Sequence, residues 1–91
     1  RMNAATLNDL MTDRDPELRR GAALAAGAKG KERLGEFAEK LIGLISDRDG
    51  VVVQAARASL KALSGQDFGP EPGADRGQAQ VAWKKWWKEQ K

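Results

Sequence analysis

The stretch "LMTDRDPELRRGAA" (Leu10–Ala23) returns 34 residues later as "LISDRDGVVVQAAR" (Leu44–Arg57). In both copies an apolar segment runs into Asp-Arg-Asp, and an alanine-rich segment follows. Asp15 and Asp49 stand where the N-cap of a helix is expected, and Pro16 suits the first helical turn because its missing N–H needs no partner there. A fixed period of 34 residues with two helices inside it is typical of an α-solenoid, in which each helix pair packs against its neighbours.

Helical spacing of apolar residues predicts five helices, over about residues 4–12, 16–28, 31–45, 50–63 and 76–90. Strand signals are limited to one valine triplet, which the repeat alignment places in a helix. The positions expected to face the core are Leu7, Leu10, Met11, Leu18, Ala22, Ala25 or Ala26, Leu34, Phe37, Ala38, Leu41, Ile42, Ile45, Val52, Ala56, Leu60 and Leu63. The expected fold is therefore all-α, a short α-solenoid of about two helix pairs closed by a C-terminal capping helix.

A Gly- and Pro-rich segment separates the repeated part from the C-terminal helix. Residues 64–77 hold four Gly and two Pro and are predicted to form a loop. Phe68 is the one large apolar residue of this loop, so we expect it to pack back against the helices. The expected organisation is one structural domain, with helical repeats over residues 1–63, the loop, and a capping helix over residues 78–91. A domain this small buries only a modest core, which predicts marginal stability.

The two copies resemble the HEAT-repeat pattern, in which an Asp turn and a Pro precede a Val-Arg pair, then an Ala, then a Leu. The resemblance covers about Leu7–Leu63, in "DRDPELRRGAA" and "DRDGVVVQAARASL". It implies a ladder between adjacent repeats made by Asp13, Arg19 and Asp47. Val53 stands where the second repeat would carry its arginine. The closing segments "SGQDFGP" and "AWKKWWKEQ" are similar to the end of HEAT-repeat proteins that finish with a "TG…FG…W..WW" signature.

Three of the five aromatic residues are tryptophans near the C-terminus. Trp83, Trp86 and Trp87 follow i, i+3, i+4 spacing, which places them on one face of a helix. Because the last unit of a solenoid would otherwise expose its core, we expect these rings and Phe68 to form a structural cap over that end.

Lysines flank the same tryptophans and leave a second interpretation open. Residues 76–91 carry five Lys and Arg against one Glu, a net charge of +4. An exposed aromatic platform beside Lys84, Lys85 and Lys88 would bind single-stranded nucleic acid, with bases stacked on the rings and lysines meeting the phosphates. Elsewhere the arginines alternate with Asp and Glu, which argues against a wider basic surface, so nucleic acid is the alternative partner and not the expected one.

The residue inventory disfavours catalysis and metal binding. The chain has no Cys, His or Tyr, so it lacks cysteine and histidine nucleophiles, Ser-His-Asp triads and the usual zinc ligands. The Asp-Arg-Asp turns offer too few acids for an EF-hand-type calcium loop, and Ala58 stands where that loop needs its last carboxylate. We therefore expect no enzyme activity, no metal and no cofactor.

The expected function is that of a non-catalytic protein-binding or scaffolding module of a larger protein, because helical repeats present extended binding surfaces. The opening Arg1-Met2 suggests a fragment excised from a longer chain, and we expect a monomer or a part of such a chain. No apolar run is long enough for a transmembrane helix. The sequence names neither the protein partner nor the compartment.

Overall fold

The computed structural model describes residues 3–90, and these form five α-helices and one short 3-10 turn, with no strand. The elements are α1 (Ala4–Leu10), α2 (Pro16–Gly27), the 3-10 turn η1 (Lys31–Arg33), α3 (Leu34–Leu44), α4 (Gly50–Ser64) and α5 (Arg76–Glu89). The all-α class and the five predicted helices are confirmed, and the compact molecule has a Cα radius of gyration of 11.7 Å. Residues 1, 2 and 91, which the expected domain ranges include, lie outside the described part. Within residues 3–90 no helix is both long and apolar enough to cross a membrane.

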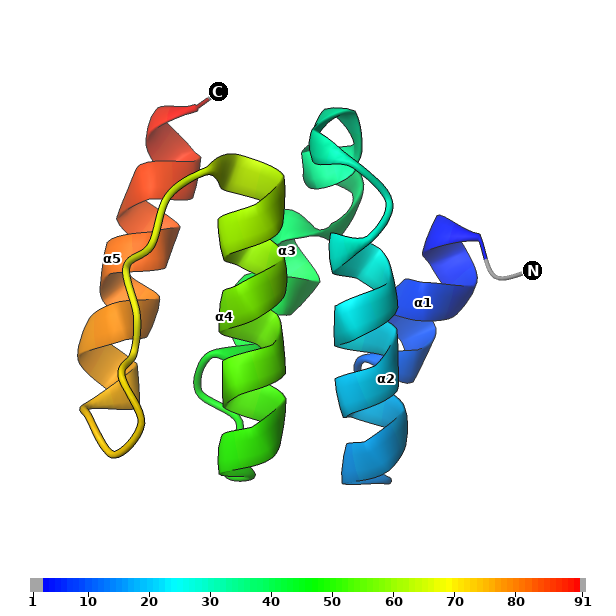
Figure 1. Cartoon of the computed structure of the whole chain (residues 1–91), viewed down its shortest axis with the longest axis horizontal. Coiled ribbons are helices and arrows are strands. Elements are labelled where there is room, and N and C mark those ends of the chain that lie inside the picture. The colour runs from blue at the N-terminus through cyan, green and yellow to red at the C-terminus, as the bar shows by residue number, and fades with distance from the viewer. Residues whose placement is uncertain (1–2, 91) are drawn as a thin grey trace.

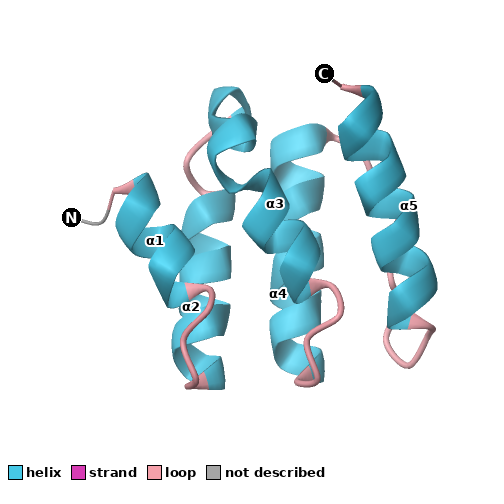
Figure 2. Ribbon diagram, turned by 180° about the vertical axis from the view of Figure 1, so that it is seen from behind, coloured by secondary structure: helices cyan, strands magenta, loops and turns pink. Residues whose placement is uncertain are grey.

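The helices lie in two layers. Helices α2 and α4 run side by side in one layer, while α1, α3 and α5 follow one another in the other layer (Figures 1 and 2). The most extensive contacts are those of α4 with α2 and α3. Helix α5 packs along α3. The loop of residues 65–75 runs from the end of α4 back alongside that helix to the start of α5 (Figure 1).

Aspartates begin three of the helices, and at two of them, Asp15 and Asp49, the sequence predicts the N-cap. The side chain of Asp15 accepts a hydrogen bond from the N–H of Glu17 (2.9 Å), and that of Asp49 accepts one from the N–H of Val51 (3.0 Å). The Asp75 side chain accepts hydrogen bonds from the N–H groups of Gly77 (2.8 Å) and Gln78 (3.2 Å) at the start of α5. Each carboxylate thereby satisfies backbone donors that a helix start leaves without a partner.

Most of the positions expected to face the core are buried. These are Leu7, Met11, Ala22, Ala26, Phe37, Ala38, Leu41, Ile42, Ile45, Val52, Ala56, Leu60 and Leu63. Leu10, Ala25 and Leu34 are only partly buried against the core. The prediction for Leu18 was wrong, since its side chain is 44% exposed. It lies nine residues before Gly27, which faces α4, and therefore points to the opposite side of α2.

Helices α2 and α4 approach closely at one point. The Ser59 hydroxyl of α4 donates a hydrogen bond to the Ala23 carbonyl of α2 at 2.5 Å. A Cβ at Gly27 would lie 2.3 Å from the Ser59 Oγ and 2.8 Å from the Ser59 Cα. Residue 27 must therefore be glycine, because α4 approaches the C-terminal end of α2 too closely there to leave room for a side chain.

We expect Gly27→Ala to lower the free energy of unfolding by about 1–3 kcal/mol, because α2 and α4 must separate to admit the methyl group. Gly21→Ala in the same helix is the matched control, since no atom lies within 4 Å of its added Cβ. That variant should be neutral or more stable by up to about 1 kcal/mol, through helix propensity. Urea denaturation followed by circular dichroism compares the two, and a loss of the same size in both would contradict the close approach.

Candidate functional site

The arginine of the first helix pair joins the two Asp-Arg-Asp turns. The Arg19 guanidinium donates to both carboxylate oxygens of Asp47, from Nε to Oδ2 at 2.8 Å and from Nη2 to Oδ1 at 3.1 Å. Its Nη1 also donates to the carbonyl oxygens of Asp13 (2.8 Å) and Arg14 (2.9 Å). Hydrogen bonding to Asp47 raises the pKa of Arg19. The three ladder residues thus come together, but Asp13 contributes its backbone carbonyl and not its carboxylate.

A second arginine, which the sequence analysis missed, binds the second turn. The Arg76 Nη1 at the start of α5 donates to the Asp47 carbonyl at 2.7 Å. Arg19 makes the equivalent bond to the Asp13 carbonyl one repeat earlier. Val53 of α4 stands 34 residues after Arg19, at the equivalent position of the second copy, and its side chain is buried. The sequence signal that could have indicated this bond is the position of Arg76, a basic residue directly after the N-cap Asp75 of the last helix.

Phe68 of the loop and the three tryptophans of α5 form one aromatic cluster. Trp83 is fully buried, and its ring meets Phe68 edge-on at 4.9 Å and Trp86 edge-on at 5.9 Å, between centroids. The Trp83 Nε1–H donates to the Gly69 carbonyl at 2.8 Å. Trp86 and Trp87 are partly buried against the core. A ring that is already enclosed cannot stack on a base, so Trp83 is not available as a platform.

The lysines of α5 lie in solvent. Lys84, Lys85 and Lys88 are all exposed. A hollow of about 300 Å³ between α3 and α5 is lined by Glu39, Ile42, Lys84, Trp87 and Lys88. These cations are accessible to phosphates, and Lys91 of the same basic tail lies outside the described residues.

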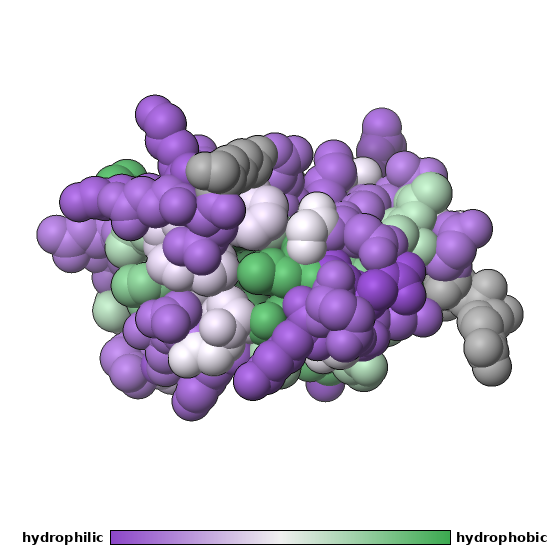
Figure 3. All heavy atoms as spheres, turned by 90° about the horizontal axis from the view of Figure 1, so that it is seen from above, coloured by the Kyte–Doolittle hydropathy of each residue, from purple (hydrophilic) through white to green (hydrophobic). Residues whose placement is uncertain are grey.

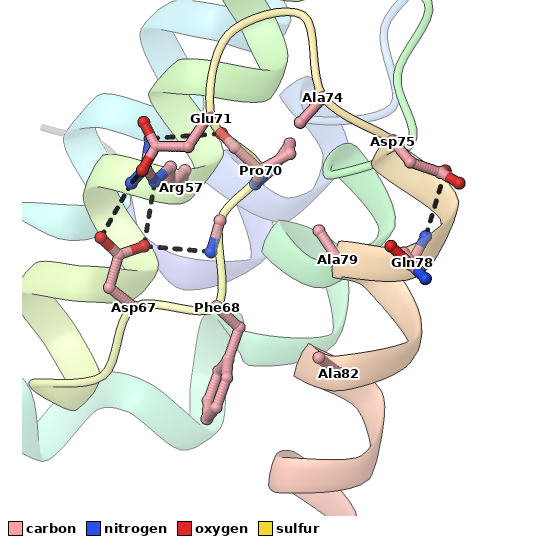
Figure 4. A pocket seen from close by; sticks show the side chains of 11 residues that line it. Arg57, Asp67, Phe68, Pro70, Glu71, Ala74, Asp75, Gln78, Ala79 and Ala82 are labelled. Atoms are coloured by element: carbon pink, nitrogen blue, oxygen red, sulfur yellow. Dashed lines mark hydrogen bonds and ion pairs between the residues drawn. The ribbon is translucent and has the colours of Figure 1, made fainter.

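The loop is held to α4 by a salt-bridge cluster (Figure 4). The Arg57 guanidinium donates to both carboxylate oxygens of Asp67, each at 2.9 Å, and to Glu71 at 3.0 Å. Hydrogen bonds from Arg57 lower the pKa of Asp67 to about 2. In Figure 4 the Phe68 ring points away from this cluster. A hollow of about 600 Å³ between the loop and α5 borders this salt-bridge cluster. The charged side chains of the cluster bind one another, which leaves them less available to a ligand in the hollow.

A shallow groove with apolar edges runs between α2 and α4. It has a volume of about 400 Å³ and is lined by Arg20, Leu24, Gly50, Val51, Gln54, Ala55 and Ala58. Leu24 is 41% exposed and Val51 is 57% exposed. Figure 3 shows the face of the molecule at the C-terminal ends of α2 and α4. Most side chains on this face are hydrophilic, and they surround a smaller hydrophobic area. The sequence analysis did not single out this groove, because it depends on which faces of α2 and α4 meet.

No group of three or more Asp and Glu that could hold a metal ion is found within residues 3–90. Comparison with protein-family models, curated proteins and solved structures finds no match to this chain. The candidate sites therefore rest on the geometry of the chain itself.

We expect Trp83→Ala to lower the free energy of unfolding by about 3–5 kcal/mol, because it removes a fully buried indole and leaves a cavity. Val81→Ala on the same helix is the control, since Val81 is exposed and its loss should change stability by less than about 0.5 kcal/mol. Urea titrations followed by circular dichroism measure both. Equal stability of the two variants would place the indole on the surface.

The Asp67 pKa of about 2 in the folded chain lies below the ordinary value of about 3.9 expected in the unfolded chain. The bond to Arg57 therefore stabilises the fold fully above about pH 4, and this stabilisation is lost as the pH falls toward 2. We expect the urea midpoint of the wild-type chain to fall more steeply over this range than that of Asp67→Asn. Parallel pH profiles for the two proteins would show that Asp67 is not the group responsible.

Proposed function

We propose that this chain is a HEAT-like helical repeat module that binds another protein and performs no chemistry. The 34-residue repeat, the two helix layers and the bidentate bond between Arg19 and Asp47 support the repeat assignment. Helix α5 and the loop would close the last repeat. Non-catalytic function is supported by the absence of Cys, His and Tyr from the sequence.

The groove between α2 and α4 carries the proposal for protein binding. Leu24 and Val51 expose apolar surface on its two sides, and Ala55 and Ala58 keep its floor open to an incoming side chain. Arg20 supplies a charged group on the α2 side, and Gln54, whose amide binds the Pro70 carbonyl of the loop, lies on the α4 side. An apolar anchor surrounded by polar groups is the usual composition of a protein-binding patch.

A photo-crosslinking amino acid placed at Leu24 or Val51 tests this proposal in an extract of the source cells. We expect one protein to cross-link saturably from these positions and not from Glu89, which is exposed on α5. Excess unlabelled wild-type chain should compete, whereas the Leu24→Glu/Val51→Glu variant, shown to be folded by circular dichroism, should not. Capture that is equal from all three positions, or that both competitors remove, would overturn the assignment of the groove.

Nucleic-acid binding through α5 is the second candidate, supported by the exposure of Lys84, Lys85 and Lys88. Burial of Trp83 removes one of its three stacking rings. Fluorescence anisotropy with a labelled single-stranded oligonucleotide tests it. Binding that weakens steeply with salt and disappears when the three lysines are replaced together by alanine would favour this function over the protein-binding groove.

A further inference from the structure

The groove between α2 and α4 adjoins a second hollow at the end where these two helices begin. The helices start side by side at the same end of the molecule (Figures 1 and 2). The second hollow, here called the arginine hollow, measures about 460 Å³ and is lined by Arg14, Pro16, Arg19, Arg48, Asp49 and Gly50. Gly50 also lines the groove. A chain segment that lies in the groove and continues past Gly50 therefore enters the arginine hollow.

Two of the arginines in this hollow have no carboxylate partner in the described part of the chain. Arg14 and Arg48 are the middle residues of the two Asp-Arg-Asp turns, and both side chains are exposed. Within residues 3–90 neither forms an ion pair with Asp or Glu, whereas Arg19 binds Asp47. The hollow thus presents two guanidinium groups that no carboxylate of these residues meets at contact distance.

The aspartates beside these arginines bind the main chain of the turns instead. Asp13 Oδ1 accepts the Asp15 N–H at 2.9 Å, and Asp47 Oδ1 accepts the Asp49 N–H at 2.8 Å. Asp15 and Asp49 in turn cap the starts of α2 and α4. Alternating charge in the sequence therefore does not become alternating ion pairs in the fold, and the two middle arginines stay exposed.

The dimensions and composition of the two adjoining concavities specify the segment that would fill both. Residues 50 and 58 of α4 both line the groove, and eight residues of helix extend about 12 Å along the axis. An extended chain covers that length in about four residues. None of the residues that line the groove or the hollow is aromatic, so a nucleobase finds no ring on which to stack. These features favour a protein segment over a nucleic acid.

We propose that the segment bound by the groove carries an acidic side chain within about four residues of its apolar anchor, and that Arg14 and Arg48 bind its carboxylate. A guanidinium matches a carboxylate with two parallel N–H···O bonds, which gives direction as well as attraction. The ion pair fixes which end of the partner segment lies where α2 and α4 begin. This inference rests on the proposed function, because it takes the groove as the protein-binding surface, and it adds the charge of the partner.

A displayed library of random short peptides, selected on the immobilised full chain, tests the proposal. We expect the enriched peptides to share a large apolar residue with Asp or Glu within about four positions. Selection on Arg14→Gln/Arg48→Gln should keep the apolar residue and lose the preference for acids. This variant should fold, because the Arg14 carbonyl that accepts Arg19 belongs to the main chain, and circular dichroism checks it. An equal preference for acids in both selections would overturn the proposal.

Affinities of one enriched peptide and its neutral counterpart, with Gln for Glu or Asn for Asp, sharpen the test. By fluorescence anisotropy, the neutral peptide should bind the wild-type chain about fivefold more weakly and the arginine variant equally well. Lys40→Gln/Lys85→Gln is the matched control, since it also removes two exposed cations, and neither lines the groove or the arginine hollow. The control should keep the fivefold difference, and its loss there would show a general charge effect and contradict the proposal.

Failure of the proposed function gives a different result from failure of this inference. If no peptide is enriched, or if Leu24→Glu/Val51→Glu leaves peptide binding unchanged, the groove is not the binding surface and both proposals fall. Enrichment of apolar peptides without acids leaves the groove in place and overturns this inference alone. A single-stranded oligonucleotide that binds the wild-type chain but not Arg14→Gln/Arg48→Gln would assign the arginine hollow to nucleic acid and likewise overturn it.

Discussion

The enclosure of the Trp83 indole between the loop and the helices is the interaction on which the closure of the molecule depends. Two helix pairs leave the far side of α3 and α4 open, and a chain of 91 residues buries too little core to leave it so. Trp83 is fully buried there, and its N–H is satisfied by the Gly69 carbonyl. The same ring meets Phe68 edge-on, so this side chain joins the loop to α5, in addition to the bonds from Arg57 to the loop and from Arg76 to Asp47.

The Asp-Arg-Asp turns align the successive elements through arginine. Arg19 and Arg76 each donate to the carbonyl of the first aspartate of a turn, and so connect that turn to a helix that follows it. Because the Arg19 and Asp47 side chains are only 14% and 9% exposed, neither charge is well hydrated and each needs the other. This pairing sets α2 beside α4, and their spacing in turn shapes the groove that carries the proposed function.

The two candidate binding surfaces lie on different elements of the molecule. The groove between α2 and α4 is apolar at its edges, whereas the outer side of α5 carries exposed lysines.

The sequence alone determined the features that arise within one helix or turn. The five helices follow from the 3.6-residue period, and Asp15, Asp49 and Asp75 begin three of them because a carboxylate satisfies donors only two or three residues away. Tertiary structure decided the rest. Leu18 has the period of a core residue, yet it is exposed because burial depends on a neighbouring helix. The bond from Arg76 to Asp47 spans 29 residues, a distance in sequence over which no local pattern specifies a contact.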